Sequence, residues 1–149
     1  MTGELRELYQ ELIFDHYKRP RNCHVLLGAN RRAEGHNPLC GDRITVYLKV
    51  EDGIIRDVAF EGDGCAIATA SASLMTEALK GKPVTEVSHL FEGFRDMVTD
   101  ADAAAHPNLG KLEVLAGVRE FPARVKCATL AWHTLNAALK QQRTPVSTE

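Results

Sequence analysis

The sequence predicts an α+β fold in which a small antiparallel sheet, of about three strands, packs against several helices. Residues 43–60 contain two β-branched segments of alternating polarity around a tight turn, which is typical of a hairpin. Most other apolar residues recur at helical spacing. The chain of 149 residues shows no internal repeat and no dividing linker, so we expect residues 1–149 to form a single domain.

The first expected helix covers residues 4–20, the stretch ELRELYQELIFDHYKRP. The apolar residues at helical spacing within it are Leu5, Leu8, Leu12 and Ile13. Pro20 ends this pattern. Residues 20–42 are rich in Pro, Asn, Gly and Arg, and we expect them to be mostly loop.

The hairpin is expected to begin with a strand at 43–50, RITVYLKV. Residues 51–53 contain the Asp-Gly pair that favours a two-residue hairpin turn. The return strand is expected at 54–60. The glycines of 61–64, EGDG, interrupt the alternation, so we expect the second strand to end there.

The second half of the chain is expected to be mainly helical. Gly81 is a typical helix stop and Pro122 a typical helix start. Trp132 and Leu135 of the last helix are expected to pack in the core. The expected segments are helices at 65–81, 83–98, 111–118 and 121–142, a loop at 99–110 and a polar tail at 143–149.

Composition excludes several classes of protein as a first interpretation. Hydrophobic residues make up 44% and charged residues 26%, and the net charge is −2, which argues against nucleic acid or an acidic membrane surface as partner. The N-terminal segment resembles neither a signal peptide nor a transit peptide, and no stretch is apolar enough to span a membrane. We therefore expect a cytoplasmic protein with reduced cysteines.

Charge is unevenly distributed along the chain. The basic early residues are Lys18, Arg19, Arg21, Arg31 and Arg32. The acidic middle residues are Glu86, Glu92, Asp96, Asp100 and Asp102. These runs fit either two solvated faces or a docking surface for a partner protein. If a partner docks, we expect it to bind the basic early region together with the loops around Cys40.

The chain contains four cysteines: Cys23, Cys40, Cys65 and Cys127. Cys40 lies in PLCGD, where the glycine permits an unusual backbone. Cys65 follows two glycines at the start of an expected helix, and Cys127 lies near the start of another. Helix N-termini expose N–H groups that favour the thiolate, the form that binds metals. Cys23 lacks such a context, so we expect it to be a bystander.

A turn at 40–42 can direct a thiol and a carboxylate the same way. Together with two further cysteines this makes three sulfur donors and one oxygen donor, which suits tetrahedral zinc. The candidate ligands are Cys40, Asp42, Cys65 and Cys127. Arg124 and Lys126 would offset the excess negative charge of such a site.

Spacing alone does not establish this site. There are 24 residues between Cys40 and Cys65 and 61 between Cys65 and Cys127, so ordinary buried cysteines also fit. His36 is expected either to support the site from outside the ligand set or to be solvated on a loop. His133, six residues past Cys127, is expected to point away from the site.

Three motifs resemble those of the U-type iron–sulfur cluster assembly family, which comprises IscU, the NifU N-domain and SufU. They are NPLCGDRI, GDGCAIATASASLMTE and FPARVKCATLAW, and the resemblance covers nearly the whole chain. Within the family the chain resembles the SufU branch. IscU carries a histidine before its third cysteine, where this chain has Lys126, and a chaperone-recognition motif where this chain has EFPARVK.

The resemblance implies a SufE/NifU-like fold and one zinc ion held by Cys40, Asp42, Cys65 and Cys127. It implies that the protein accepts sulfur from the persulfide of a SufS-type cysteine desulfurase and passes it to a SufB-type scaffold. A histidine of the desulfurase would take a place on the zinc, so that Cys40 is released to receive the sulfur. Arg124 matches the arginine of the third motif.

Two other functions remain open at this point. The same ligands could hold a [2Fe–2S] cluster, which would make the protein an IscU-like scaffold that assembles and transfers clusters. Alternatively, a structural zinc could stabilise the fold without any chemistry. A thiol hydrolase fits poorly, because no histidine stands in a recognisable catalytic partnership with a cysteine.

Overall fold

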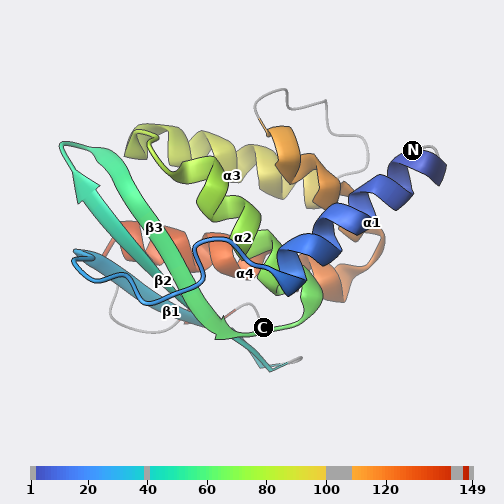
Figure 1. Cartoon of the computed structure of the whole chain (residues 1–149), viewed down its shortest axis with the longest axis horizontal. Helices are drawn as coiled ribbons and strands as arrows, with labels where there is room; N and C mark the ends of the chain where they lie inside the picture. Colours follow the sequence, from blue (N-terminus) through green and yellow to red (C-terminus); the bar gives the residue numbers. More distant parts are fainter. Residues whose placement is uncertain (1–2, 39–40, 100–108, 142–145, 148–149) are drawn as a thin grey trace.

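The computed structural model describes residues 3–38, 41–99, 109–141 and 146–147, with side chains from residue 7 onward (Figure 1). The elements are, in chain order, α1 (Gly3–Lys18), β1 (Arg31–Asn37), β2 (Asp42–Glu51), β3 (Ile54–Asp63), α2 (Ala66–Leu79), α3 (Val84–Thr99), η1 (Gly110–Glu120), α4 (Pro122–Leu139) and β4 (Val146–Ser147). The α+β class is confirmed. No helix among the described residues is both long enough and apolar enough to cross a membrane.

One sheet carries the fold, with the strand order β3-β2-β1-β4. β1, β2 and β3 are antiparallel, whereas β4 pairs parallel to β1 through Gly35 with Val146 and His36 with Ser147. The expectation of a small antiparallel sheet of about three strands is therefore confirmed for β1, β2 and β3, and β4 is an additional parallel strand. The expected polar tail is wrong at Val146–Ser147, because these residues add a short edge strand.

The hairpin between β2 and β3 forms as expected, but its second strand is longer. Asp52 and Gly53 have φ of 54° and 73°, the left-handed pair that a type I′ turn requires. β3 continues to Asp63 instead of ending at residue 60. Gly62 makes this continuation possible: its φ is 147°, and a Cβ there would lie 2.1 Å from the carbonyl oxygen of Arg43.

β1 lies inside the stretch 20–42 that was expected to be mostly loop, so that expectation is wrong for Arg31–Asn37. The inward positions of β1 are Ala33, Gly35 and Asn37, which lack the large apolar side chains of an ordinary strand. Their size follows from α4, which packs directly against β1. A Cβ on Gly35 would lie 2.0 Å from Oγ1 of Thr134, so only glycine fits this contact.

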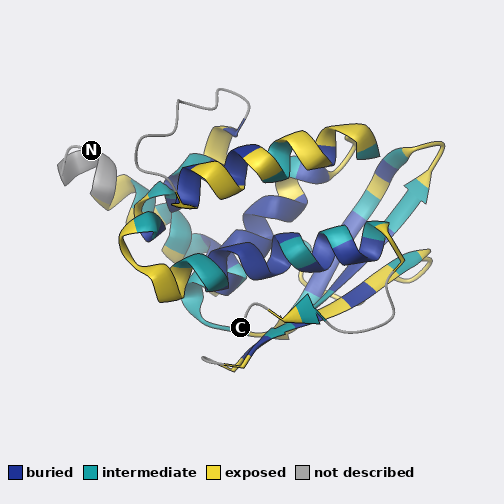
Figure 2. Ribbon diagram, turned by 180° about the vertical axis from the view of Figure 1, so that it is seen from behind, coloured by how far each residue is buried: buried dark blue, intermediate teal, exposed yellow. Residues whose placement is uncertain are grey.

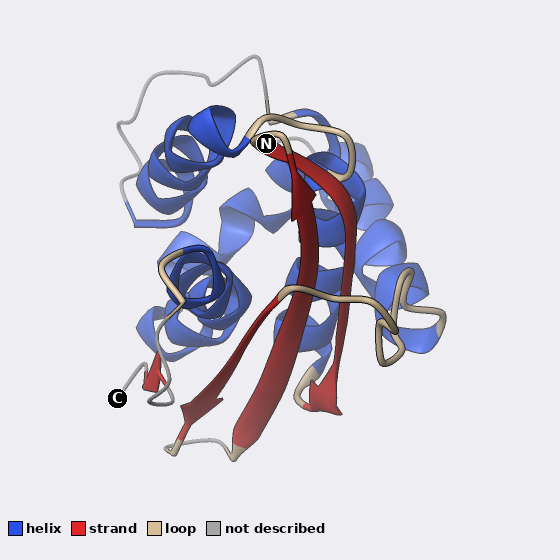
Figure 3. Ribbon diagram, turned by 90° about the vertical axis from the view of Figure 1, so that its left-hand side faces the viewer, coloured by secondary structure: helices blue, strands red, loops and turns tan. Residues whose placement is uncertain are grey.

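The helices lie on one side of the sheet, with α4 against β1 and β2 and α2 against β3 (Figures 1 and 3). α2 and α4 are buried over most of their length, whereas α3 is buried along one side (Figure 2). Trp132 is fully buried and stacks on Phe94 at 4.9 Å between ring centroids, so its expected place in the core is confirmed. The expected helix at 111–118 is a longer 3₁₀ helix, η1.

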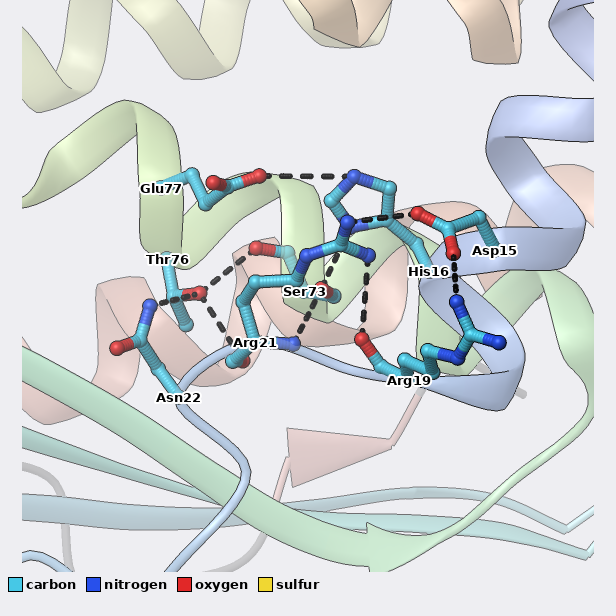
Figure 4. A network of polar contacts seen from close by, with 8 residues as sticks. All are labelled: Asp15, His16, Arg19, Arg21, Asn22, Ser73, Thr76 and Glu77. Carbon is cyan, nitrogen blue, oxygen red and sulfur yellow. Dashed lines mark hydrogen bonds and ion pairs between the residues drawn. The ribbon is translucent and has the colours of Figure 1, made fainter.

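α1 is fixed to α2 through a buried histidine (Figure 4). His16 is 1% exposed, and its Nδ1 lies 2.7 Å from Oγ of Ser73 while its Nε2 lies 3.5 Å from Glu77. The backbone N–H of Arg21 donates to the same Ser73 oxygen at 2.9 Å, so the hydroxyl proton is available to Nδ1. Burial, and then the charge of Arg21, lower the pKa of His16. The neutral ring therefore bridges the two helices.

Candidate metal centre

Three elements bring one potential ligand each to the same place. Asp42 begins β2, Cys65 is the N-cap residue of α2, and Cys127 lies near the start of α4. Their ligand atoms all lie within 4.8 Å of one another. Asp42 and Cys127 are buried and Cys65 is half-buried. Among the residues that the structure describes, this is the one group of three or more such side chains close enough to hold a metal ion.

Asp42 and Cys65 are joined by backbone as well as side chain. Oδ1 of Asp42 accepts a hydrogen bond from the Cys65 N–H at 2.8 Å, and Oδ2 lies 3.5 Å from the Cys65 Sγ. A Cβ on Gly64 would lie at an ordinary contact distance of 3.6 Å from Oδ1 and at a tighter 3.2 Å from the Ala68 Cβ. The carboxylate therefore fixes the chain at the point where α2 begins.

The Cys65 thiol also acts as the helix cap. Its Sγ accepts the backbone N–H of Ala68 at 3.4 Å, which satisfies one of the free donors of the first turn. The expected placement of this cysteine at a helix start is confirmed. The Cys65 sulfur therefore has a backbone N–H as its donor, and it faces the Asp42 carboxylate.

Cys127 has a polar neighbour, Asn37, that none of the sequence motifs predicts as part of the site. Nδ2 of Asn37 donates a hydrogen bond to the Cys127 Sγ at 3.9 Å. Asn37 is 2% exposed, and it stands opposite Asp42 in the register of β1 and β2. Asn37 lies in the stretch HNPLCGD, close to two predicted ligands, and this proximity is the one sequence signal for a role at the site. No spacing rule connects an asparagine there with a cysteine on a distant helix.

The three described donors fit a tetrahedral zinc ion. With Zn–S near 2.3 Å and Zn–O near 2.0 to 2.2 Å, neighbouring donors lie roughly 3.5 to 3.8 Å apart. The 3.5 Å between the Cys65 Sγ and Oδ2 of Asp42 meets this spacing. The largest separation between ligand atoms, at most 4.8 Å, exceeds the spacing around zinc by about 1 Å, and small side-chain rotations can bring the atoms that much closer. Two thiolates with one carboxylate are also the donor types that zinc accepts.

Two predicted site residues are placed less directly. Cys40 lies outside the described residues, but its neighbour Gly41 has φ of 76° and donates its N–H to the Asn37 carbonyl at 2.9 Å. Arg124 is exposed on the first turn of α4, where its guanidinium lies 4.8 Å from the ring centroid of Phe121. Because Arg124 precedes Cys127 by three residues, both lie on the same side of α4.

The histidines considered with the site lie elsewhere. His36 alternates with the buried Gly35 and Asn37 along β1, so it stands on the opposite face of the strand from Asn37 and does not support the described ligands Asp42, Cys65 and Cys127. His133 packs edge-on against Phe91 at 5.1 Å, away from the cysteines as expected. Burial is the main cause that lowers the pKa of His133, and the positive charge of Arg95 lowers it further.

Cys23 is exposed and lies beside β3, where it forms a bridge with Phe60. It is not a member of the metal group described above. Partial loss of water raises the pKa of its thiol, and the charge of Glu61 raises it further. The expectation that Cys23 is a bystander to the site agrees with this position.

The basic early residues are largely paired within the protein. Arg21 lies 2.6 Å from Asp15 and Arg32 lies 2.8 Å from Glu34, while Arg31 donates to the Leu139 carbonyl at 2.8 Å. Partners within the protein therefore neutralise two of these arginines and take up hydrogen-bond donors of a third. Asp100 and Asp102 of the acidic run lie outside the described residues.

Comparison with known proteins identifies similar chains over nearly the whole length. The family model described as NifU-like N terminal domain matches residues 8–128. The zinc-dependent sulfurtransferase SufU of Bacillus subtilis (strain 168) is 43% identical over 95% of each chain. The iron–sulfur cluster assembly scaffold protein IscU of Streptococcus pyogenes serotype M1 is also 43% identical, over 93% of this chain and 87% of its own.

A solved structure shows the same architecture. FiSufU of Fervidobacterium islandicum AW-1, described as an iron–sulfur cluster assembly scaffold protein for the SUF system, is 34% identical and superposes with a TM-score of 0.83. The match covers 90% of this chain and 98% of that chain. The arrangement of the sheet and helices is therefore shared with it.

Proposed function

The chain belongs to the NifU-like N-terminal domain family of iron–sulfur cluster assembly proteins, which includes IscU and SufU, and on that premise we propose that it is a zinc-dependent sulfurtransferase. It takes sulfur from the persulfide of a SufS-type cysteine desulfurase and passes it to a SufB-type scaffold. The observation that carries the proposal is the convergence of Asp42, Cys65 and Cys127 within 4.8 Å.

The zinc ion is held by Cys40, Asp42, Cys65 and Cys127. Bound zinc supplies one thing to the chemistry: it keeps the cysteines deprotonated and protects them from oxidation. Cys40 is adjacent in sequence to Gly41, whose left-handed backbone begins the return into β2. Cys65 and Cys127 are carried by helices packed in the core, so they suit a holding role. Asp42 is the weaker ligand, since a carboxylate is harder than a thiolate.

Sulfur transfer on Cys40 is a thiol exchange. The Cys40 thiolate attacks the terminal sulfur of the donor persulfide, a new S–S bond forms on Cys40, and the S–S bond of the donor breaks. The donor cysteine leaves as its thiolate, so electrons balance without an oxidant or reductant. Arg124, exposed on the first turn of α4, offers a fixed positive charge to the anionic persulfide and the leaving thiolate.

A second candidate is an IscU-like scaffold that assembles and transfers a [2Fe–2S] cluster. The equal identity of 43% to the Streptococcus pyogenes scaffold favours it as much as the SufU match favours sulfur transfer. Lys126 argues for sulfur transfer, because an ammonium directly before Cys127 offers no ligand to iron. A purely structural zinc is the third candidate.

Metal and sulfide analysis of the protein purified without oxygen tests the first two candidates. The sulfurtransferase proposal expects about one zinc per chain and no sulfide. Iron with matching sulfide would support the scaffold and contradict the proposal.

A desulfurase assay separates sulfur transfer from a structural zinc. The expected result is that the protein stimulates a SufS-type desulfurase and that Cys40→Ala abolishes the stimulation. Cys23→Ala is the matched control, since Cys23 is an exposed thiol that is not a member of the described metal group. Full stimulation by the Cys40 variant would contradict the proposal.

A further inference from the structure

Asn37 reaches Cys127 because β1 packs against α4 with no space for a Cβ at Gly35. Gly35, two residues earlier on the same face of β1, contacts Thr134 and Leu130 so closely that a Cβ would overlap the Thr134 hydroxyl. At this distance between strand and helix, the Asn37 amide extends to the Cys127 Sγ, with 3.9 Å between nitrogen and sulfur. Both residues are almost completely buried, at 2% and 5% exposed, so little water competes for the contact.

An N–H donor changes the chemistry of a sulfur ligand. A hydrogen bond to a thiolate is charge-assisted and withdraws electron density from the sulfur. Outer hydrogen-bond partners of this kind tune metal ligands and are part of the design of metal sites. A thiolate stabilised in this way is a weaker nucleophile, because nucleophilicity falls as the anion becomes more stable.

We propose that Asn37 is a positioning residue whose amide N–H holds Cys127 as a ligand and keeps it from accepting the sulfur. The inference rests on the proposed zinc-dependent sulfur transfer and deepens it. Cys65 receives the equivalent donor from the backbone N–H of Ala68. Both cysteines of the metal group therefore accept a hydrogen bond: Cys65 from the backbone of Ala68, and Cys127 from the side chain of Asn37.

Two substitutions separate the donor from the shape of the side chain. Asn37→Leu keeps nearly the same size and branching without an N–H, and Asn37→Asp keeps the shape but presents an acceptor. His36→Ala is the matched control, because His36 is the neighbouring residue on the opposite face of β1. A role in packing alone would leave the electronic properties of the Cys127 sulfur unchanged in Asn37→Leu.

The first readout is the absorption spectrum of the protein loaded with cobalt(II) alone. Loss of the N–H raises the energy of the sulfur electrons, so the sulfur-to-cobalt charge-transfer bands move to longer wavelength in both Asn37 variants and stay in place in His36→Ala. Bands that stay in place in both Asn37 variants would overturn the inference. No thiolate–cobalt bands in the unsubstituted protein would overturn the metal centre, and this inference with it.

The second readout is the position of the sulfur after reaction of the zinc-loaded protein with glutathione persulfide, mapped by peptide mass spectrometry. We expect about three- to tenfold more persulfide on Cys127 in Asn37→Leu than in the unsubstituted protein. An unchanged low level on Cys127, with other cysteines labelled normally, would overturn the inference alone. Failure of the unsubstituted protein to take sulfur on any cysteine would overturn the proposed sulfur transfer, while the cobalt bands would still report on Asn37.

Discussion

Oδ1 of Asp42 accepts the backbone N–H of Cys65 at 2.8 Å, so one carboxylate both anchors the start of α2 and faces the thiol that caps it. The first residue of β2 and the cap of α2 are 23 positions apart in sequence, yet they share a hydrogen bond. Asp42 and Cys65 each therefore have a structural role, which does not depend on metal, and a proposed role as a metal ligand. Substitutions can separate the two.

Asp42→Asn is expected to keep the structure and lose the metal. The amide oxygen still accepts the Cys65 N–H, but it is neutral and a poor zinc ligand. We expect zinc affinity to fall by more than the roughly 10–100-fold that loss of an outer hydrogen-bond partner costs. A competition titration against a chelator measures it, with urea unfolding of the metal-free protein as the control. Unchanged affinity would show that the carboxylate does not bind the metal.

Cys65→Ser and Cys65→Ala are expected to differ in stability but not in metal binding. Serine is a good N-cap residue, whereas alanine removes the acceptor for the Ala68 N–H, at a cost of about 0.5–2 kcal/mol. Both variants lack the thiolate and should lose zinc. Urea unfolding of the two metal-free proteins provides the comparison. Equal stability of the two would mean that the Cys65 Sγ does not act as a cap.

Gly35→Ala is expected to destabilise the protein by about 1–3 kcal/mol, because the new methyl group overlaps the Thr134 hydroxyl. The double variant Gly35→Ala/Thr134→Ala removes the oxygen and leaves the Thr134 Cβ and a Leu130 methyl, at 3.3 Å and 3.2 Å, as the nearest atoms. It should therefore recover part of the loss. A double-mutant cycle by denaturant unfolding tests this, and additive effects would contradict the contact.

Acidification below about pH 7 is expected to destabilise the fold through His16. Its pKa in the folded protein lies below the ordinary value of 6.5, so between the two values the unfolded chain binds more protons and stability falls as pH falls. The charges that face it are Arg21, Glu77, Asp15 and Lys111. His16→Gln should reduce the pH dependence of the unfolding free energy between pH 7.5 and about 5.5.

The measurement for His16 is urea unfolding of the metal-free protein at the two pH values, so that protonation of metal ligands does not contribute. His24→Gln is the matched replacement, because His24 is an exposed histidine. An identical pH dependence in His16→Gln and the unsubstituted protein would contradict the assignment of a buried neutral ring to His16.

Much of the fold and family could be predicted from local signals. The hairpin turn at Asp52 and Gly53, the helix start at Pro122 and the core position of Trp132 each follow from a few neighbouring residues. The resemblance to U-type assembly proteins rested on three local motifs, and the family is confirmed. These features were accessible because backbone preference and apolar periodicity are local properties.

β1 and the partners of His16 could not be predicted in this way. β1 carries Ala33, Gly35 and Asn37 on its inner face because α4 leaves no space there, and that constraint lies about a hundred residues further along the chain. Ser73 became the partner of His16 only when α1 packed on α2. The tertiary contact, not the local pattern, determined the residue type in each case.

The sequence by itself determined which groups are available for chemistry: the motif cysteines, Asp42, and a glycine beside each of Cys40, Asp42 and Cys65. The tertiary structure alone decided that Asp42, Cys65 and Cys127 meet within 4.8 Å and that Asn37 reaches the third of them. The physical reason is that this meeting depends on the packing of α2 and α4 against the sheet. Contacts between residues so far apart follow from the whole core and from no local stretch.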